Sequence, residues 1–149
     1  MRIALDTNFL IYAENLHEAS QTARATRFLA GLVLHETFLP VQVLGEFHRV
    51  LARKFRWSPA NIRQSTDRWS KGAILLPTTE TVLDGARDLA EFHQFDIWDA
   101  VILSAAAEAR CDVLLSEDGH SGFNWRGVTI IDPFAGELHP LAVQLLASR

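Results

Sequence analysis

The chain opens with Arg2-Ile3-Ala4-Leu5-Asp6-Thr7-Asn8, a short apolar run that ends on an acid. The stretch Val113-Leu114-Leu115-Ser116-Glu117-Asp118 repeats this pattern, and Val128–Ile131 is a third continuous apolar run. These runs are apolar at consecutive positions rather than alternate ones, which is typical of strands buried on both faces of a parallel sheet. They decide the fold class, because a sheet of such strands needs helices on both faces to cover it.

Helical patterns separate these strands along the chain. Two more short strands are expected over 36–39 and 73–76, each closed by a proline. Helical periodicity or helix-start signals cover, approximately, 21–34, 41–55, 58–70, 79–93, 98–109 and 138–147. Strands that alternate with helices predict a three-layer α/β/α sandwich. The length of 149 residues suits a single domain over residues 1–149.

The composition excludes several classes of protein. Apolar residues make up 48% of the chain and charged residues 21%, a balance typical of globular domains. No apolar run reaches the length of a membrane span, and Asp6 comes too early for a secretory signal. Cys111 is the only cysteine, so an internal disulfide and a cysteine-based zinc site are both excluded. We therefore expect a cytoplasmic protein that does not associate with membranes.

The charge is unevenly distributed. The formal net charge is −4, yet seven of the 14 Lys and Arg residues lie within residues 49–71, where Asp67 is the only acid. A basic stripe beside an acidic site suits a phosphodiester substrate. The alternative is that this stripe is the solvated face of two surface helices. Four ring side chains are likewise open to two readings, substrate contact or ordinary packing: Trp57, Trp69, His120 and Trp125.

Two aspartates directly follow expected strands. Asp6 follows the first strand, and Asp118 comes shortly after Val113–Leu115. Each taken alone is better explained as a capping or turn residue. In parallel α/β sheets, however, functional residues gather at the carboxyl ends of the strands. The repetition at two strand ends therefore favours a site at this edge.

The other two candidate acids lie on expected helices. Asp96 suits the N-cap of the helix after it, whereas Asp99 is followed at i+3 and i+4 by apolar Ile102 and Leu103. The Asp99 carboxylate therefore leans towards the core and needs a partner. Locally, Glu46 is better explained as a surface residue that pairs with Arg49, three positions later on the same helix. It becomes a candidate because its helix begins just after a strand end, on the side of the sheet that carries Asp6.

A convergence of Asp6, Glu46, Asp99 and Asp118 needs compensation. Two like charges about 5 Å apart repel by roughly 3 kcal/mol at an effective dielectric constant near 20. Either some of the carboxyl groups hold protons or a cation lies among them. Carboxylate oxygens favour Mg²⁺ or Mn²⁺ over Zn²⁺. Such a site suits the attack of an activated water on a phosphodiester.

The ordered set of motifs resembles the PIN domain family, and specifically the VapC-type toxins of bacterial toxin–antitoxin pairs. The resemblance rests on Leu5-Asp6-Thr7-Asn8, on Glu46 in the helix after the second strand, and on Trp98-Asp99-Ala100 at the start of an alanine-rich helix. It continues through Leu114-Leu115-Ser116-Glu117-Asp118 to a closing segment over 128–134. The chain departs from the family at Asp132, where members often have asparagine before Pro-Phe.

The resemblance implies a five-stranded parallel sheet and an endoribonuclease dependent on Mg²⁺ or Mn²⁺. The four acids take the catalytic roles, and Asp6, Asp99 and Asp118 are the implied metal ligands. Asn8 takes the role of orienting Asp6, and Ser116 that of a polar helper beside the metal. The implied partners are an RNA substrate, a second copy of the chain and a small antitoxin protein that blocks the site. The basic stripe supplies candidate RNA contacts: Arg49, Arg53, Lys54 and Arg56.

Two other functions compete with this one. A non-catalytic PIN-like binding module has the same fold, but the intact set of four acids argues against it. A receiver-type phosphoacceptor domain also combines an α/β fold with clustered acids and Mg²⁺. That class needs a lysine after the last strand, and no lysine follows Val128–Ile131.

Overall fold

The computed structural model describes residues 1–118 and 120–147. All five expected strands are present, and they pair in parallel in the order β3-β2-β1-β4-β6. A two-residue strand, β5, pairs antiparallel with β6 at the edge and was not predicted. The strands are β1 (Arg2–Leu5), β2 (Glu36–Pro40), β3 (Ile74–Leu76), β4 (Val113–Leu115), β5 (Asn124–Trp125) and β6 (Val128–Ile131).

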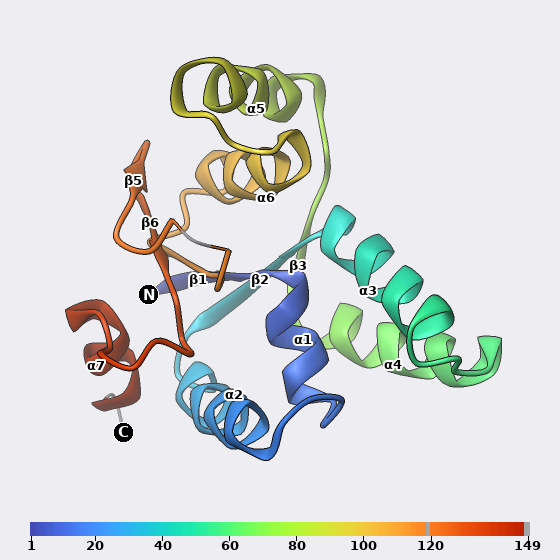
Figure 1. Ribbon diagram of the computed structural model, residues 1–149. Helices are drawn as coiled ribbons and strands as arrows, with labels where there is room; N and C mark the ends of the chain where they lie inside the picture. Colours follow the sequence, from blue (N-terminus) through green and yellow to red (C-terminus); the bar gives the residue numbers. More distant parts are fainter. Residues whose placement is uncertain (119, 148–149) are drawn as a thin grey trace.

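Helices cover both faces of the sheet, which confirms the predicted three-layer sandwich (Figure 1). The helices α5 and α6 lie over one face, and α1, α2 and α7 lie over the other. The helices α3 and α4 pack side by side and project beyond the sheet. Their bounds are α1 (Thr7–Ala13), α2 (Ala19–Leu32), α3 (Val41–Arg53), α4 (Pro59–Gly72), α5 (Glu80–His93), α6 (Ile97–Glu108) and α7 (Pro140–Ala147).

The strand order reverses between β1 and β4, the two central strands. From β1 the chain proceeds outwards to β2 and β3, and β4 then returns to the other side of β1. Leu5 pairs with Leu115 at the carboxyl ends of these strands. This switch point is where α/β sheets open a crevice for ligands. The sheet topology therefore places the segments that follow β1 and β4 side by side.

The helix α6 is the most deeply buried element of the upper layer. Asp96 caps it by accepting hydrogen bonds from the backbone N–H groups of Trp98 (2.9 Å) and Asp99 (3.4 Å), and every residue from Ala100 to Ala106 is buried. Its small side chains allow α5 to approach closely. At the contact, a Cβ atom on Gly85 would lie only 2.5 Å from Ser104 Oγ. The spacing of α5 and α6 therefore depends on glycine at this position.

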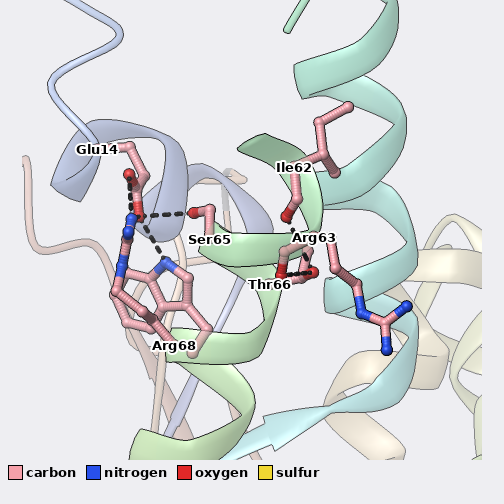
Figure 2. Close-up of polar contacts among 7 residues, drawn as sticks. Glu14, Ile62, Arg63, Ser65, Thr66 and Arg68 are labelled. Carbon is pink, nitrogen blue, oxygen red and sulfur yellow. Dashed lines mark hydrogen bonds and ion pairs between the residues drawn. The ribbon is translucent and has the colours of Figure 1, made fainter. Parts of the chain in front are cut away.

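A largely buried carboxylate joins the projecting helix α4 to the core. Glu14, the C-cap residue of α1, accepts hydrogen bonds from Ser65 Oγ (2.9 Å) and Trp69 Nε1 (3.0 Å), and it forms an ion pair with Arg68 (3.2 Å) (Figure 2). Trp69 and Trp57 both pack against the hydrophobic core. These contacts support the packing reading of the two tryptophans.

None of the helices in the described ranges is long and apolar enough to cross a membrane.

Candidate active site

Asp6 lies directly after β1, where the chain turns into α1. It caps this helix, because its Oδ1 accepts a 2.6 Å hydrogen bond from the backbone N–H of Thr7. Its own N–H donates to the carbonyl oxygen of Leu115 on β4 (3.1 Å). Only 5% of the residue is exposed. The sheet edge and the helix cap together fix the carboxylate at the switch point.

Ser116 joins Asp6 to the segment that follows β4. Its hydroxyl donates a 2.6 Å hydrogen bond to Asp6 Oδ2, and Asp118 Oδ2 lies 3.4 Å from the same Oγ. The backbone N–H of Asp118 donates back to Ser116 Oγ at 3.3 Å. One buried hydroxyl is therefore shared between the carboxylates of two neighbouring strand ends.

Glu46 reaches the same place from the middle of α3. Its Oε2 accepts a 2.6 Å hydrogen bond from the Thr7 hydroxyl, and its Oε1 accepts a 3.0 Å bond from Gln42 Nε2. The adjacent face of α3 is buried through Val43, Phe47 and Leu51, which sets the rotation of the helix and places Glu46 on the flank of the buried stripe. The ion pair with Arg49 that was weighed from the sequence is therefore replaced by contacts to Thr7 and Gln42.

Asp99 lies in the first turn of α6, where a negative charge complements the helix dipole. The side chain is half-buried. Burial is the main cause that raises the pKa of this carboxyl group to about 6, and the negative charges of Asp118, Asp96 and Glu46 raise it further. The Asp99 carboxyl group on α6 is therefore close enough to Asp118 and Glu46 for their charges to affect its pKa.

A pocket of about 410 Å³ brings the four acids together. Asp6, Glu46, Asp99 and Asp118 all line it, as do Thr7 and Asn8. Burial raises the pKa of Asp6 well above its ordinary value, the Asp118 carboxyl group adds to this effect, and the hydrogen bond from Ser116 opposes it. Both pKa values are raised mainly by burial and further by the neighbouring acids, and a cation in the pocket would favour the ionised carboxylates.

The other rim of the pocket is basic. Arg49 and Arg53 line it from the second half of α3, and Lys54 lines it from the C-cap position. Within residues 1–118 and 120–147, these three side chains form no ion pair. Arg56, the fourth cation predicted from the sequence, lies beyond the end of α3 and is not among the residues that line the pocket. The pocket therefore combines free positive charge on one side with carboxylates on the other.

The chemistry of the donor set fits a hard divalent cation. Carboxylate and hydroxyl oxygens are the ligands that Mg²⁺ and Mn²⁺ prefer, and here they come from four separate segments. In the described part of the chain, however, no three His, Cys, Asp or Glu side chains are already arranged to hold one ion. Coordination of an ion by several of these acids therefore requires side-chain rotations in the pocket.

A larger pocket of about 630 Å³ lies elsewhere, lined in part by Leu29 and Leu32 of α2 and by Trp69 of α4. Among the described residues that line it, Glu14 is the single carboxylate, and its oxygens are engaged by α4 (Figure 2). We place the site in the smaller pocket because the acids with raised pKa values lie there.

The model of the PIN domain family matches residues 3–123, which include all four acids. The chain belongs to the PIN domain family. The match ends before β6, so the last strand and α7 complete the fold outside it. No curated protein sequence matches this PIN domain.

Three solved structures resemble this PIN domain. VapBC2 of Rickettsia felis, bound to a promoter DNA fragment, has a TM-score of 0.59 at 18% identity and covers 79% of this chain and 88% of its own. VapC20 of Mycobacterium tuberculosis, a toxin that cleaves the sarcin–ricin loop, has a TM-score of 0.63 at 20% identity, with coverages of 78% and 90%. A toxin–antitoxin complex of Klebsiella pneumoniae has a TM-score of 0.62 at 17% identity, with coverages of 88% and 97%. At these identities, the likeness shows a shared fold.

The sequence reasoning missed two residues that hold the acids in place. Thr7 supplies both the N–H that binds Asp6 and the hydroxyl that binds Glu46, and Gln42 holds the other Glu46 oxygen. The signal for Gln42 was its position four residues before Glu46, on the same helix face. Asn8 lines the pocket, and its proposed role in orienting Asp6 stays a prediction. His120 stacks on Phe95, with ring centroids 3.9 Å apart.

Proposed function

We propose that this PIN domain is an endoribonuclease dependent on Mg²⁺ or Mn²⁺ that hydrolyses RNA phosphodiesters. One observation carries the proposal: carboxylates from α3, α6 and the segments that follow β1 and β4 line a single pocket whose opposite rim is basic. An acidic cluster suits a divalent cation, and a basic rim suits the phosphates of a nucleic acid. The combination favours phosphodiester chemistry over the binding of a neutral ligand.

We assign each residue of the pocket a separate role. Asp6, Asp99 and Asp118 are the proposed metal ligands, with Glu46 as the fourth carboxylate of the site. A bound cation would polarise the phosphate and lower the pKa of a bound water. Ser116 holds Asp6 in one orientation through a 2.6 Å hydrogen bond. Thr7 holds Glu46 in the same way, also at 2.6 Å. These two hydroxyls limit the rotation of Asp6 and Glu46 only.

The basic rim positions the RNA. Arg49 and Arg53 lie about one helical turn apart on α3, and Lys54 follows at the C-cap. Cations without an acidic partner bind phosphates at a lower cost, because no existing ion pair has to break. Contacts of this kind fix the register of the backbone and carry no sequence information. The rim therefore accounts for affinity rather than for the choice of RNA.

We further propose that the protein acts as the toxin of a toxin–antitoxin pair, as a cytoplasmic homodimer that a small antitoxin protein inhibits. The support is the likeness of fold to VapBC2, VapC20 and the Klebsiella complex, together with the sequence motifs of the VapC type. A small upstream reading frame that encodes a DNA-binding protein with a tail would support this part of the proposal.

Cleavage of RNA by the purified protein tests the proposal. We expect cleavage with Mg²⁺ or Mn²⁺, no cleavage with a chelator, and growth arrest on expression. Asp6→Asn and Asp99→Asn are each expected to abolish cleavage and toxicity while the circular dichroism spectrum is unchanged. Full toxicity of both variants would exclude the four-acid site. A wild-type protein that binds RNA but neither cleaves it nor binds Mg²⁺ at millimolar concentration would instead be a non-catalytic module.

A further inference from the structure

The four acids of the pocket are not held equally well. Asp6 is buried and accepts two hydrogen bonds of 2.6 Å, and Glu46 accepts two from its neighbours. Asp118 is exposed, and its carboxylate lies 3.4 Å from Ser116 Oγ. An exposed carboxylate beyond the end of a strand has several rotamers and backbone conformations available. A contact that restricts the segment around Asp118 would therefore help to keep this carboxylate in the pocket.

The residue before Asp118 is anchored to another element. Glu117 Oε1 accepts a short hydrogen bond from the hydroxyl of Tyr12, which lies on α1, 105 residues earlier in the chain. Tyr12 is 7% exposed, so the contact is shielded from water on the side of the ring. Burial and the Glu117 carboxylate both raise the pKa of Tyr12 above its ordinary value, so the phenol stays protonated and remains a donor.

The tyrosine ring is itself fixed by aromatic contacts. Phe134, from the segment after β6, meets it edge to face with ring centroids 4.6 Å apart at 87°. His17, from the loop after α1, meets it with centroids 4.9 Å apart at 71°. Contacts from two sides leave the ring little freedom to rotate. The hydroxyl of Tyr12 therefore presents a fixed donor to the segment after β4.

The helix α1 connects this anchor to the rest of the site. Its N-terminus carries Asp6 and Thr7, which hold one side of the pocket, and its fifth and sixth residues are Ile11 and Tyr12. One helix thus fixes the position of Asp6 directly and the position of Glu117 through the Tyr12 hydroxyl. The distance between the Asp6 and Asp118 carboxylates then depends on both ends of the same element.

We propose that Tyr12 and Glu117 are positioning residues, which clamp the segment after β4 onto α1 and so hold Asp118 beside Asp6. The proposal rests on the proposed function for its effect on cleavage, and on the hydrogen bond and the aromatic contacts for its geometry. Neither residue is proposed to touch the substrate. Glu117 acts as a hydrogen-bond acceptor, so its oxygen matters and its charge does not.

Three variants separate the clamp from other roles. Tyr12→Phe removes the hydroxyl and keeps the ring, Glu117→Ala removes the acceptor, and Glu117→Gln keeps an acceptor oxygen without the charge. We expect kcat for RNA to fall about tenfold to a hundredfold in the first two. KM is expected to stay unchanged, and Glu117→Gln should retain most of the wild-type kcat. The affinity for Mn²⁺ alone, measured by calorimetry, should also fall in Tyr12→Phe and Glu117→Ala and should be largely retained in Glu117→Gln.

Ser65→Ala is the matched control. It also deletes a buried hydroxyl that donates to a glutamate, but this glutamate is Glu14 at the C-cap of α1, away from the acidic pocket (Figure 2). Tyr12→Phe should accelerate hydrogen exchange at the backbone amide of Asp118, whereas Ser65→Ala should leave both this exchange and kcat unchanged. Amide exchange does not depend on activity, so it tests the clamp even if the wild type proves inactive towards RNA.

Two results would overturn the clamp. One is that Tyr12→Phe matches Ser65→Ala in amide exchange at Asp118, in Mn²⁺ affinity and in kcat. The other is that Glu117→Gln is as defective as Glu117→Ala while Tyr12→Phe is normal, because Glu117 would then act through its own charge. A wild type without metal-dependent cleavage but with faster exchange in Tyr12→Phe would refute the proposed function and keep the clamp.

Discussion

Ser116 Oγ donates a 2.6 Å hydrogen bond to Asp6 Oδ2 across the carboxyl ends of β4 and β1. The contact exists because the strand order reverses between these two strands, so residues 110 positions apart in the chain become neighbours. The hydroxyl lowers the pKa of a carboxyl group that burial and Asp118 raise. A single serine thus offsets part of the cost of placing two acids together.

Ser116→Ala should weaken the site without unfolding the domain. The change leaves a buried Asp6 oxygen without its donor, so the pKa of Asp6 should rise further and Mn²⁺ affinity should fall about tenfold to a hundredfold. Ser116→Thr keeps the hydroxyl and serves as the control. Calorimetry at pH 7 measures both affinities. Equal affinities in the alanine and threonine variants would show that the hydroxyl is unimportant.

Asp99→Asn should stabilise the metal-free protein at neutral pH. The pKa of Asp99 is raised from 3.8 to about 6 by folding, so between these values the folded state binds more protons and stability falls as the pH rises. The asparagine variant escapes this loss. After allowance for solvent screening at a half-buried site, we expect a gain of about 1–2 kcal/mol at pH 8 and none near pH 4.

Urea denaturation with a chelator present measures these free energies of unfolding. Added Mn²⁺ should then reverse the order, because only a protein that binds the ion is stabilised by it. Identical unfolding free energies for wild type and Asp99→Asn at pH 4 and pH 8 would contradict the account of Asp99 as a charge strained by burial and by its acidic neighbours.

Arg53→Ala should weaken RNA binding in a salt-dependent manner. Arg53 lines the pocket and has no ion pair within the described residues. Its loss should reduce the slope of log affinity against log salt by about 0.7–0.9. Arg63→Ala removes the same charge from α4, where Arg63 pairs with Asp67 at 3.5 Å, and should leave the slope unchanged. Equal slopes for the two variants would place the RNA elsewhere.

Gly85→Ala should destabilise the contact between α5 and α6. The added Cβ atom would lie 2.5 Å from Ser104 Oγ and 3.0 Å from Trp125, so the helix or the β5 hairpin must shift, at a cost of about 1–3 kcal/mol. Gly45→Ala is the control, because nothing lies within 4 Å of the added atom. Thermal unfolding of the two variants measures the difference. A neutral effect at Gly85 would mean that this packing is looser than the structure indicates.

The sequence was most informative where burial was continuous. Five strands and the helices from α2 to α7 were predicted, because continuous apolar runs such as Val128–Ile131 indicate buried strands and the apolar stripe of α3 has a helical period. The helix α1 was not delimited, since five of its seven residues are buried and it shows no amphipathic period. The strand β5 was missed because two residues carry no pattern, and its pairing depends on β6.

Part of the site was likewise predictable from the sequence, and part of it was not. Asp6 and Asp118 follow strands, so a rule about strand ends selected them before the structure placed them in one pocket. The contacts that orient the acids were invisible in the sequence, because Thr7 meets Glu46 across 39 residues and Tyr12 meets Glu117 across 105. Trp125 is close to Gly85 and stacks with Arg126 at 4.1 Å, which only the three-dimensional packing reveals.

The most direct test of the central claim is a calorimetric titration of Mn²⁺ into the metal-free protein, with Asp6→Asn and Asp99→Asn alongside. The four acids enter one pocket from separate segments, so losing either carboxylate should weaken binding at the same site. We predict saturable binding by the wild type and a loss of at least tenfold in affinity for each variant. No saturable binding by the wild type, or equal affinities in all three proteins, would contradict a metal site built from these carboxylates.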